Sequence, residues 1–245
     1  MTLPFDALTS RRTSAPPVSL GLFITGTSTG VGKTWAAASL VRELRRFGVD
    51  AVALKPFCCG PRDDAECLFL ANEKVLPIES VNPVWFRAPA APYVAAMAEG
   101  RHVDVDLALS TVRSAKEKHE LVIVEGAGGW RVPVRRDYAI ADFARDLDLP
   151  VVVVACNRLG TINHTLLTAE SIRHSHVPFL GTLLNDPAPS VHQEPEEQLA
   201  ALTNPAILED LLGSALLDHI PWNGSPVRLA QSLRSPSTLP RAVED

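Results

Sequence analysis

Cysteine is scarce in this sequence, and the cysteines show no pairing pattern. The 245 residues include four, Cys58, Cys59, Cys67 and Cys156, and they form no C-x-x-C pair. Four cysteines are too few to cross-link a chain of this length, so we expect reduced thiols and a cytoplasmic protein. A metal cluster built from the first three is disfavoured, because adjacent cysteines chelate one ion awkwardly.

Long apolar runs and excess positive charge are also missing. No stretch approaches the roughly 20 apolar residues that span a bilayer, and residues 1–18 lack the basic start and apolar core of a secretory signal. The formal net charge is -5, whereas a nucleic-acid surface needs concentrated lysine and arginine. We therefore expect neither a membrane nor a nucleic acid as a partner.

What the sequence does contain is a regular alternation of apolar, strand-length runs with segments of helical periodicity. Hydrophobic residues make up 46% of the chain and charged residues 21%, as in ordinary globular proteins. The runs predict strands at 20–26, 51–55, 121–126, 150–156, 178–186 and 215–221, and the periodic segments predict helices at 32–47, 104–118, 139–147, 162–174 and 206–213. This alternation indicates an α/β fold with a doubly wound, mostly parallel sheet covered by helices on both faces.

The length suits a single domain of this kind. We expect the domain to span residues 19–234, between a flexible N-terminal tail at 1–18 and a frayed C-terminal tail at 235–245. Two proline-rich regions, 82–92 and 186–198, are predicted loops, and Gly48 is placed to end the first helix.

A glycine-rich stretch, "GTSTGVGKT" at 26–34, lies between the first predicted strand and the first predicted helix. Glycines there let successive backbone N–H groups point at phosphate oxygens, and the helix N-terminus adds its dipole. Lys33 would reach the β- and γ-phosphates, and the Thr34 hydroxyl would bind Mg²⁺. Five residues separate Gly26 from Gly32, one more than in the usual phosphate-binding loop.

Two further strand ends carry charged residues that suit phosphate chemistry. Glu125 ends the strand "LVIVE" and precedes the glycine cluster "GAGG", so it is a candidate metal ligand. Lys55 ends the strand "AVALK". Because the C-terminal ends of parallel strands line the ligand crevice, its ammonium is expected near the same phosphates.

The motifs "GTSTGVGKT", "KPFCCG", "VNPVWF", "VEGAGGWRVPV", "NRLGTINHTLLTAESI", "GTLLND" and "IPW" occur in the order and approximate spacing of dethiobiotin synthetases, in the P-loop NTPase superfamily. The chain resembles this family over residues 20–222. The resemblance implies that 7,8-diaminononanoate, CO₂ and MgATP are converted to dethiobiotin, ADP and phosphate through a carbamate and a carbamic–phosphoric anhydride. It also implies a homodimer in which a second subunit completes each substrate site.

The resemblance assigns roles position by position. It implies catalytic roles for Lys33, Lys55 and Thr29, and metal binding by Thr34, Asp64 and Glu125, with Asp64 preferred to Asp63 because of its distance from "VNP". The nucleotide contacts that it implies are Gly26, Thr27, Gly30, Val31, Gly32, Lys33, Thr34, Asn185, Pro221 and Trp222, with Asn185 reading the adenine. The substrate contacts that it implies are Thr29, Lys55, Cys59, Gly128 and Gly129, together with Leu159, Gly160, Thr161, Ile162 and Asn163 of the second subunit.

Two positions depart from the family pattern. The family commonly has an acidic residue at the position of Gly30 and a serine at that of Cys59. Two alternatives therefore remain. One is a related amide- or urea-forming ligase acting on another substrate; the cobyrinate a,c-diamide synthases among such enzymes normally bring a glutaminase domain. The other is a nucleotide switch resembling partition ATPases, whose loop carries an extra lysine where this chain has Ser28.

Overall fold

The computed structural model describes residues 20–189, 195–212 and 216–234, so the predicted tails at 1–18 and 235–245 lie outside the described residues. Within the described residues, one central sheet of six parallel strands has the order β10-β9-β8-β1-β5-β2. These strands are β1 (Leu20–Gly26), β2 (Ala51–Leu54), β5 (Leu121–Glu125), β8 (Val151–Cys156), β9 (Phe179–Asn185) and β10 (Leu216–Ile220). Two short pairs lie outside this sheet: parallel β3 (Phe57–Cys59) and β4 (Val84–Phe86), and antiparallel β6 (Pro133–Arg135) and β7 (Tyr138–Ala139).

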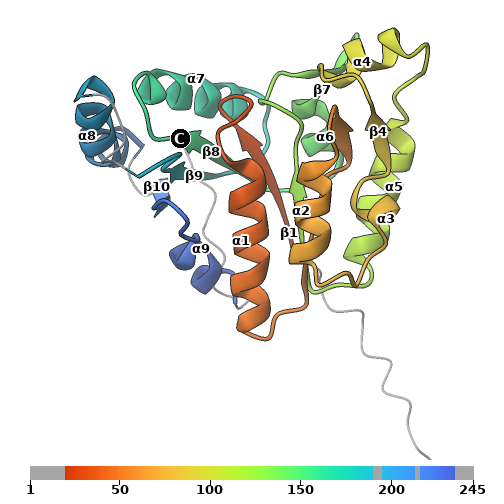
Figure 1. Cartoon of the computed structure of the whole chain (residues 1–245), viewed down its shortest axis with the longest axis horizontal. Helices are drawn as coiled ribbons and strands as arrows, with labels where there is room; N and C mark the ends of the chain where they lie inside the picture. Colours follow the sequence, from red (N-terminus) through yellow and green to blue (C-terminus); the bar gives the residue numbers. More distant parts are fainter. Residues whose placement is uncertain (1–19, 190–194, 213–215, 235–245) are drawn as a thin grey trace, which may run out of the picture.

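Helices cover both faces of the sheet (Figure 1). One face packs against α1 (Lys33–Arg46), α2 (Asp63–Ala71), α3 (Ile78–Val81) and α9 (Val227–Ser232), and the other against α5 (Val105–Lys116), α6 (Ile140–Asp146), α7 (Thr161–His174) and α8 (Pro195–Leu212). Helix α4 (Pro92–Ala98) packs on the short strands β3, β4 and β6. Alternate strand residues supply the two cores, because successive side chains of a strand point to opposite faces. On β1, for example, Leu22 and Ile24 join the α1 side and Phe23 joins the α6 side. The predicted doubly wound α/β fold is confirmed.

The predicted strands of the central sheet agree with the structure to within one residue at each end, and Gly48 has the predicted left-handed conformation after α1, with φ +82°. The prediction was wrong for α8, which begins at Pro195 and not at residue 206. Proline is well accommodated in a first helical turn, and the helix also contains Pro205, so the proline-rich composition was misleading. Loop 82–92 likewise contains the short strand β4.

Short elements with little periodicity escaped prediction, among them α2, α3, α4, α9 and β3. Periodicity needs a window of about 11 residues or more, and the longest of these elements, α2, has nine. None of the helices in the described part of the chain is both long and apolar enough to cross a membrane.

The free edge of the sheet at β2 is closed by a side chain. Asn72, fully buried at the end of α2, accepts a hydrogen bond from Ala53 N and donates one to Ala53 O, both at 2.8 Å. The amide thus satisfies the two backbone groups that a neighbouring strand would satisfy. It keeps β2, and with it the segment that follows, at a defined position in the sheet.

We expect Asn72→Ala to lower the free energy of unfolding by about 3 kcal/mol, because it leaves a buried N–H and a buried C=O unpaired. Urea denaturation followed by circular dichroism measures the change. Glu73→Ala is the matched control, because Glu73 makes only a surface ion pair with Arg45 and should cost less than about 1 kcal/mol. Equal effects of the two substitutions would contradict the assigned role.

Candidate active site

The candidate site lies where the parallel strands end. The loop Thr27–Gly32 joins β1 to α1 at the upper edge of the molecule in Figure 1. Lys55 follows β2, and Glu125 ends β5. Because all six strands run in the same direction, their C-terminal ends bring these segments to one edge of the sheet.

Glycine is sterically required in the phosphate-binding loop. A Cβ atom at Gly26 would lie 2.7 Å from Val31 Cγ2, and one at Gly32 would overlap Asn185 Nδ2. Gly32 also has φ +95° and Gly30 has φ +75°, although a Cβ at Gly30 would meet open space. The loop is held from β9, because Asn185 Nδ2 donates to Val31 O at 3.1 Å.

An ion-pair cluster, with Lys55 and Glu125 buried and Asp64 half exposed, lies beside this loop. Lys55 Nζ donates to Asp64 Oδ2 at 2.9 Å and to Glu125 Oε1, and Thr34 Oγ1 donates to the same Glu125 oxygen at 2.9 Å. The structure therefore brings together four residues that the sequence placed in one site, from α1, α2, the end of β5 and the residue after β2. Asp64, in the first turn of α2, makes this contact although its side chain is half exposed, whereas its exposed neighbour Asp63 does not.

The two lysines of the site have opposite electrostatic environments. Lys33 is buried and donates to Ser28 O at 2.9 Å. Burial, and then the nearby Lys55 ammonium, lower the pKa of Lys33 to about 8. Burial also disfavours the charged form of Lys55, but Glu125 and Asp64 outweigh it and raise the pKa of Lys55 above its ordinary value. Lys33 is thus the cation that lacks a fully compensating anion, and a phosphate group would provide one.

The oxygen atoms around Lys55 fit a magnesium ion. Glu125 Oε2 is buried and has no hydrogen-bond partner among the described residues, which leaves a buried acceptor unsatisfied. With Asp64 and the Thr34 hydroxyl it forms a set of hard oxygen donors, which Mg²⁺ prefers. The described residues contain no group of three or more His, Cys, Asp or Glu arranged for a metal. Two carboxylates suit Mg²⁺, which is commonly bound by one or two carboxylates plus substrate phosphates and water.

A cavity of about 360 Å³ opens next to the cluster. Its lining includes Thr29, Lys55, Cys59, Asp64 and Gly128, all of which the sequence assigned to the site. The neighbouring Gly129 has its Cα so close to the phosphate loop that a Cβ would lie 3.3 Å from Gly26 O. The sequence missed the apolar lining, formed by Phe57, Pro89, Ala90, Ala91, Pro92 and Val132. The small and proline-rich run 88–92 was interpreted only as a loop.

Other predicted residues lie away from this cavity. Asn185, Pro221 and Trp222 come at the ends of β9 and β10, on the opposite side of the phosphate loop from β2 and β5. The segment 159–163 begins α7, where Gly160 is a left-handed N-cap without a side-chain hydrogen bond. The cavity lining does not include these residues.

Leu159 N donates to Glu197 Oε2 at 2.9 Å, so a carboxylate of the chain itself contacts this segment.

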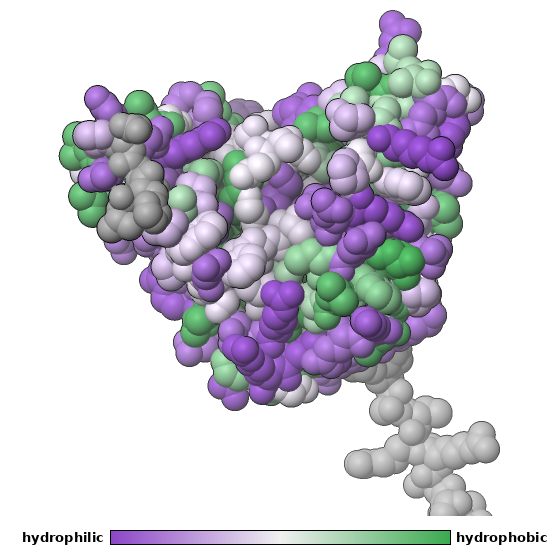
Figure 2. Space-filling model, in the orientation of Figure 1, coloured by the Kyte–Doolittle hydropathy of each residue, from purple (hydrophilic) through white to green (hydrophobic). Residues whose placement is uncertain are grey.

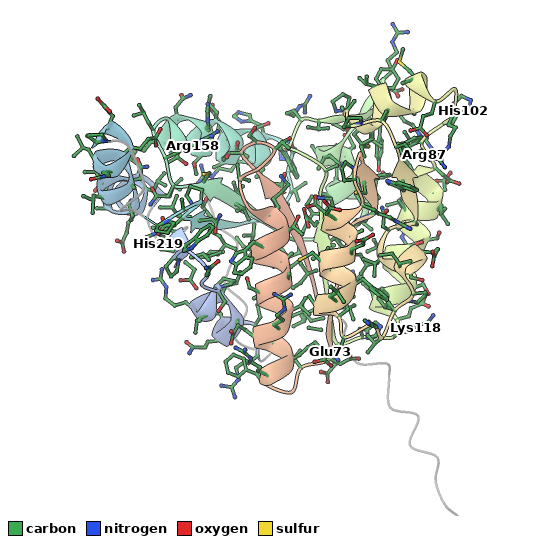
Figure 3. All side chains as sticks on the ribbon, viewed as in Figure 1. Glu73, Arg87, His102, Lys118, Arg158 and His219 are labelled. Carbon is green, nitrogen blue, oxygen red and sulfur yellow. The ribbon has the colours of Figure 1, made fainter. Side chains whose placement is uncertain are left out.

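A polar network that sequence reasoning missed holds the segment before α7. Asn157 Nδ2 donates to Asp186 Oδ1 at 2.8 Å, and His219 Nε2 lies 2.9 Å from the same oxygen. Asn204 Nδ2 donates to Asn157 Oδ1 at 3.0 Å and also to Arg158 O. Figure 3 shows Arg158 and His219 on the α7–α8 side of the molecule. The partners are 29 to 47 positions apart, so no local pattern signals the network.

Removal of the charge should affect the free energy of unfolding much more at Lys55 than at Lys33. Lys55→Met leaves the fully buried Glu125 without its countercharge, so we expect a loss of about 4 kcal/mol in the free energy of unfolding. Lys33→Met removes a poorly compensated buried charge and should change stability by less than about 1 kcal/mol, or increase it. Urea denaturation of both variants measures the contrast.

The double variant Lys55→Met/Glu125→Gln is the control for this pair. It removes both charges, so it should recover part of the stability that Lys55→Met loses. Equal stabilities of the single and double variants would contradict the assigned ion pair.

Comparison with known proteins agrees with this geometry. A family model described as an AAA domain matches residues 20–227. The "ATP-dependent dethiobiotin synthetase BioD" of Anaeromyxobacter dehalogenans is 42% identical over 219 residues, which cover 88% of this chain and 96% of that protein. The protein of the same name from Bacillus licheniformis is 41% identical over 223 residues, covering 87% and 92%.

Solved structures with low sequence identity show the fold alone. The septum site-determining protein MinD of Pyrococcus horikoshii, solved with Mg-ADP, gives a TM-score of 0.53 at 15% identity and covers 83% of this chain and 81% of its own. The cell division protein FtsY of Thermotoga maritima gives 0.52 at 15% identity, covering 90% and 70%. The resemblance inferred from the motifs is confirmed by the identity to the synthetases, and the chain belongs to the family of ATP-dependent dethiobiotin synthetases.

Proposed function

We propose that the protein closes the cyclic urea of dethiobiotin from 7,8-diaminononanoate, CO₂ and ATP. The observation that carries the proposal is the cluster of Lys33, Thr34, Lys55, Asp64 and Glu125 beside a cavity of about 360 Å³. Together they match a phosphoryl transfer to a small organic substrate. Membership of the synthetase family supports the choice of substrate.

The reaction needs no nucleophile from the protein. One substrate amine adds to CO₂ and loses a proton, which gives a carbamate. A carbamate oxygen attacks the γ-phosphorus of ATP and displaces ADP, and the second amine then attacks the carbamoyl carbon and expels phosphate. The ring closes with one urea carbon from CO₂. The cavity lining contains Cys58 and Cys59, but burial raises the pKa of both thiols, which keeps them protonated and unreactive.

The protein's contribution is electrostatic stabilisation and positioning. Negative charge spreads over the transferred phosphoryl group, and the buried Lys33 and Lys55 ammonium groups stabilise it. Gly26, Gly30 and Gly32 let the loop backbone approach the phosphates, while Thr29 and the backbone at Gly128 face the carbamate from the cavity. Thr34, Asp64 and Glu125 would hold Mg²⁺, which supplies positive charge to the phosphate oxygens.

We expect purified protein with MgATP, bicarbonate and 7,8-diaminononanoate to release phosphate and form dethiobiotin, identified by mass spectrometry. Lys33→Met should lower turnover by several orders of magnitude, because it removes a charge from the transition state. Its fold serves as the internal control, since its stability is expected to be retained. Phosphate release that does not depend on the diamine would favour a nucleotide switch, and a product from another acid or amine would favour the related ligase.

We further propose a cytoplasmic homodimer in which each substrate site is shared. Leu159, Gly160, Thr161, Ile162 and Asn163 do not line the cavity of their own subunit, but the uncapped start of α7 is suited to an anion such as the substrate carboxylate. The cavity is bordered by α4, where Val94 and Met97 expose apolar side chains. Figure 2 shows apolar surface at the upper right, where Figure 1 labels α4. In the proposed dimer, a second subunit covers α4 and contributes its own α7 segment to the cavity.

A charge at the start of α7 tests the proposed carboxylate site. Asn163→Asp puts a negative charge where the substrate carboxylate is proposed to bind. It should not destabilise α7, because an acidic residue in the first turn of a helix is favourable. We expect it to raise the KM for the diamine without changing the KM for ATP. Equal changes in both constants would count against a carboxylate site at α7.

Lys33→Met and Asn163→Asp should complement each other when unfolded and refolded together. At a diamine concentration far below the raised KM, both parental homodimers should be nearly inactive. A mixed dimer has one site with both defects and one intact site, so under this condition random pairing should restore roughly a quarter of wild-type activity. The two variants refolded separately and then combined are the control. No recovery in mixed dimers, verified by tagged subunits, would overturn the shared site.

A further inference from the structure

Trp35 joins the start of α1 to a turn at the far end of the chain. It directly follows Thr34, and its side chain is 38% exposed. The indole Nε1 donates to Gly224 O at 2.8 Å, across 189 positions of sequence. The phosphate-binding helix is therefore linked to the segment after β10.

Gly224 closes a tight turn that begins at Pro221. Gly224 N donates to Pro221 O at 2.7 Å, and a Cβ at Gly224 would lie 2.7 Å from Pro221 Cδ. Asn223, inside the turn, has φ +58°, a conformation that non-glycine residues rarely adopt. Trp222, in the same turn, is 49% exposed. The hydrogen bond from Trp35 thus holds a turn of rare backbone conformation, and this turn carries the indole of Trp222.

The strand order separates this turn from the reacting groups. In the sequence β10-β9-β8-β1-β5-β2, the phosphate loop follows β1, near the middle. Lys55, Glu125 and the cavity belong to the β5–β2 side, whereas Asn185 and the turn belong to the β9–β10 side. A nucleotide whose terminal phosphate faces the cavity must extend its nucleoside the other way, towards Trp35 and Trp222.

We propose that Trp35 is a positioning residue for the nucleobase. Its indole N–H holds the Pro221–Gly224 turn against α1, and so sets the distance between that turn and the Asn185 amide. The base is a flat ring that stacks on exposed aromatic and proline surface. This inference rests on the proposed function only in taking a nucleotide as the ligand.

Isothermal titration calorimetry with MgADP and with magnesium tripolyphosphate, which has no base, tests the proposal. Trp35→Phe keeps an aromatic ring but removes the N–H. It should weaken ADP binding by about tenfold, the equivalent of one lost hydrogen bond. Tripolyphosphate binding should not change, and the unfolding midpoint should fall by no more than the loss of one exposed hydrogen bond. In turnover, the KM for ATP should rise while the KM for the diamine stays constant.

Trp85→Phe is the matched control. Trp85 Nε1 donates to Gly60 O at 2.9 Å, a bond of the same kind beside β3 and β4, and its removal should leave ADP affinity unchanged. Unaltered ADP affinity in Trp35→Phe, or a proportional loss for ADP and tripolyphosphate, would overturn the proposal. If wild-type protein binds ADP but forms no dethiobiotin, the proposed reaction fails while this inference is still tested by the same titrations.

Discussion

The Lys55 ammonium, buried between Glu125 and Asp64, is the interaction on which the site depends. It joins β2, β5 and α2, and the hydrogen bond from Thr34 to Glu125 adds α1. Neither Lys55 nor Glu125 could be buried alone, because desolvation of an unpaired charge would exceed any packing gain. The elements that form the candidate site are therefore held together by the charged residues that we propose to act in phosphoryl transfer. The Asn72 clamp on Ala53 supports the same arrangement, since it positions the strand that leads into Lys55.

The cluster also explains how one site can hold one lysine that is paired within the protein and another whose charge is left for a ligand. Lys55 is charge-compensated within the protein, so it holds the carboxylates in place. Lys33 is buried without a matching anion, so its charge is available to a phosphate group. The unpartnered Glu125 Oε2 is the complementary feature, an anion oxygen available to a cation. Nucleotide phosphates and Mg²⁺ together would satisfy both groups.

The strand order divides the site into two halves around the phosphate loop. Cys59, Asp64 and the apolar cavity wall lie on the β5–β2 side, and Asn185 with the Pro221–Gly224 turn lies on the β9–β10 side. The departures from the family pattern fall in the loop and on the cavity side, at Gly30 and Cys59. At Gly30 the backbone has φ +75° but the surrounding space is open, so conformation and not crowding disfavours a side chain there.

By itself the sequence determined the central strands, the phosphate loop, the strand-end residues Lys55 and Glu125 and, through its motifs, the family. These features depend on local apolar runs and on short spacings, which a one-dimensional pattern records. Only the tertiary structure decided that Lys55 pairs with both carboxylates, that Asn72 closes the sheet edge and that Trp35 reaches Gly224. The short helices and the start of α8 were likewise decided by packing, which overrides weak periodicity and proline composition. Each of these contacts joins residues that the order of the strands and the burial of side chains bring together. The spacing of neighbouring residues in the sequence predicts neither the strand order nor the burial.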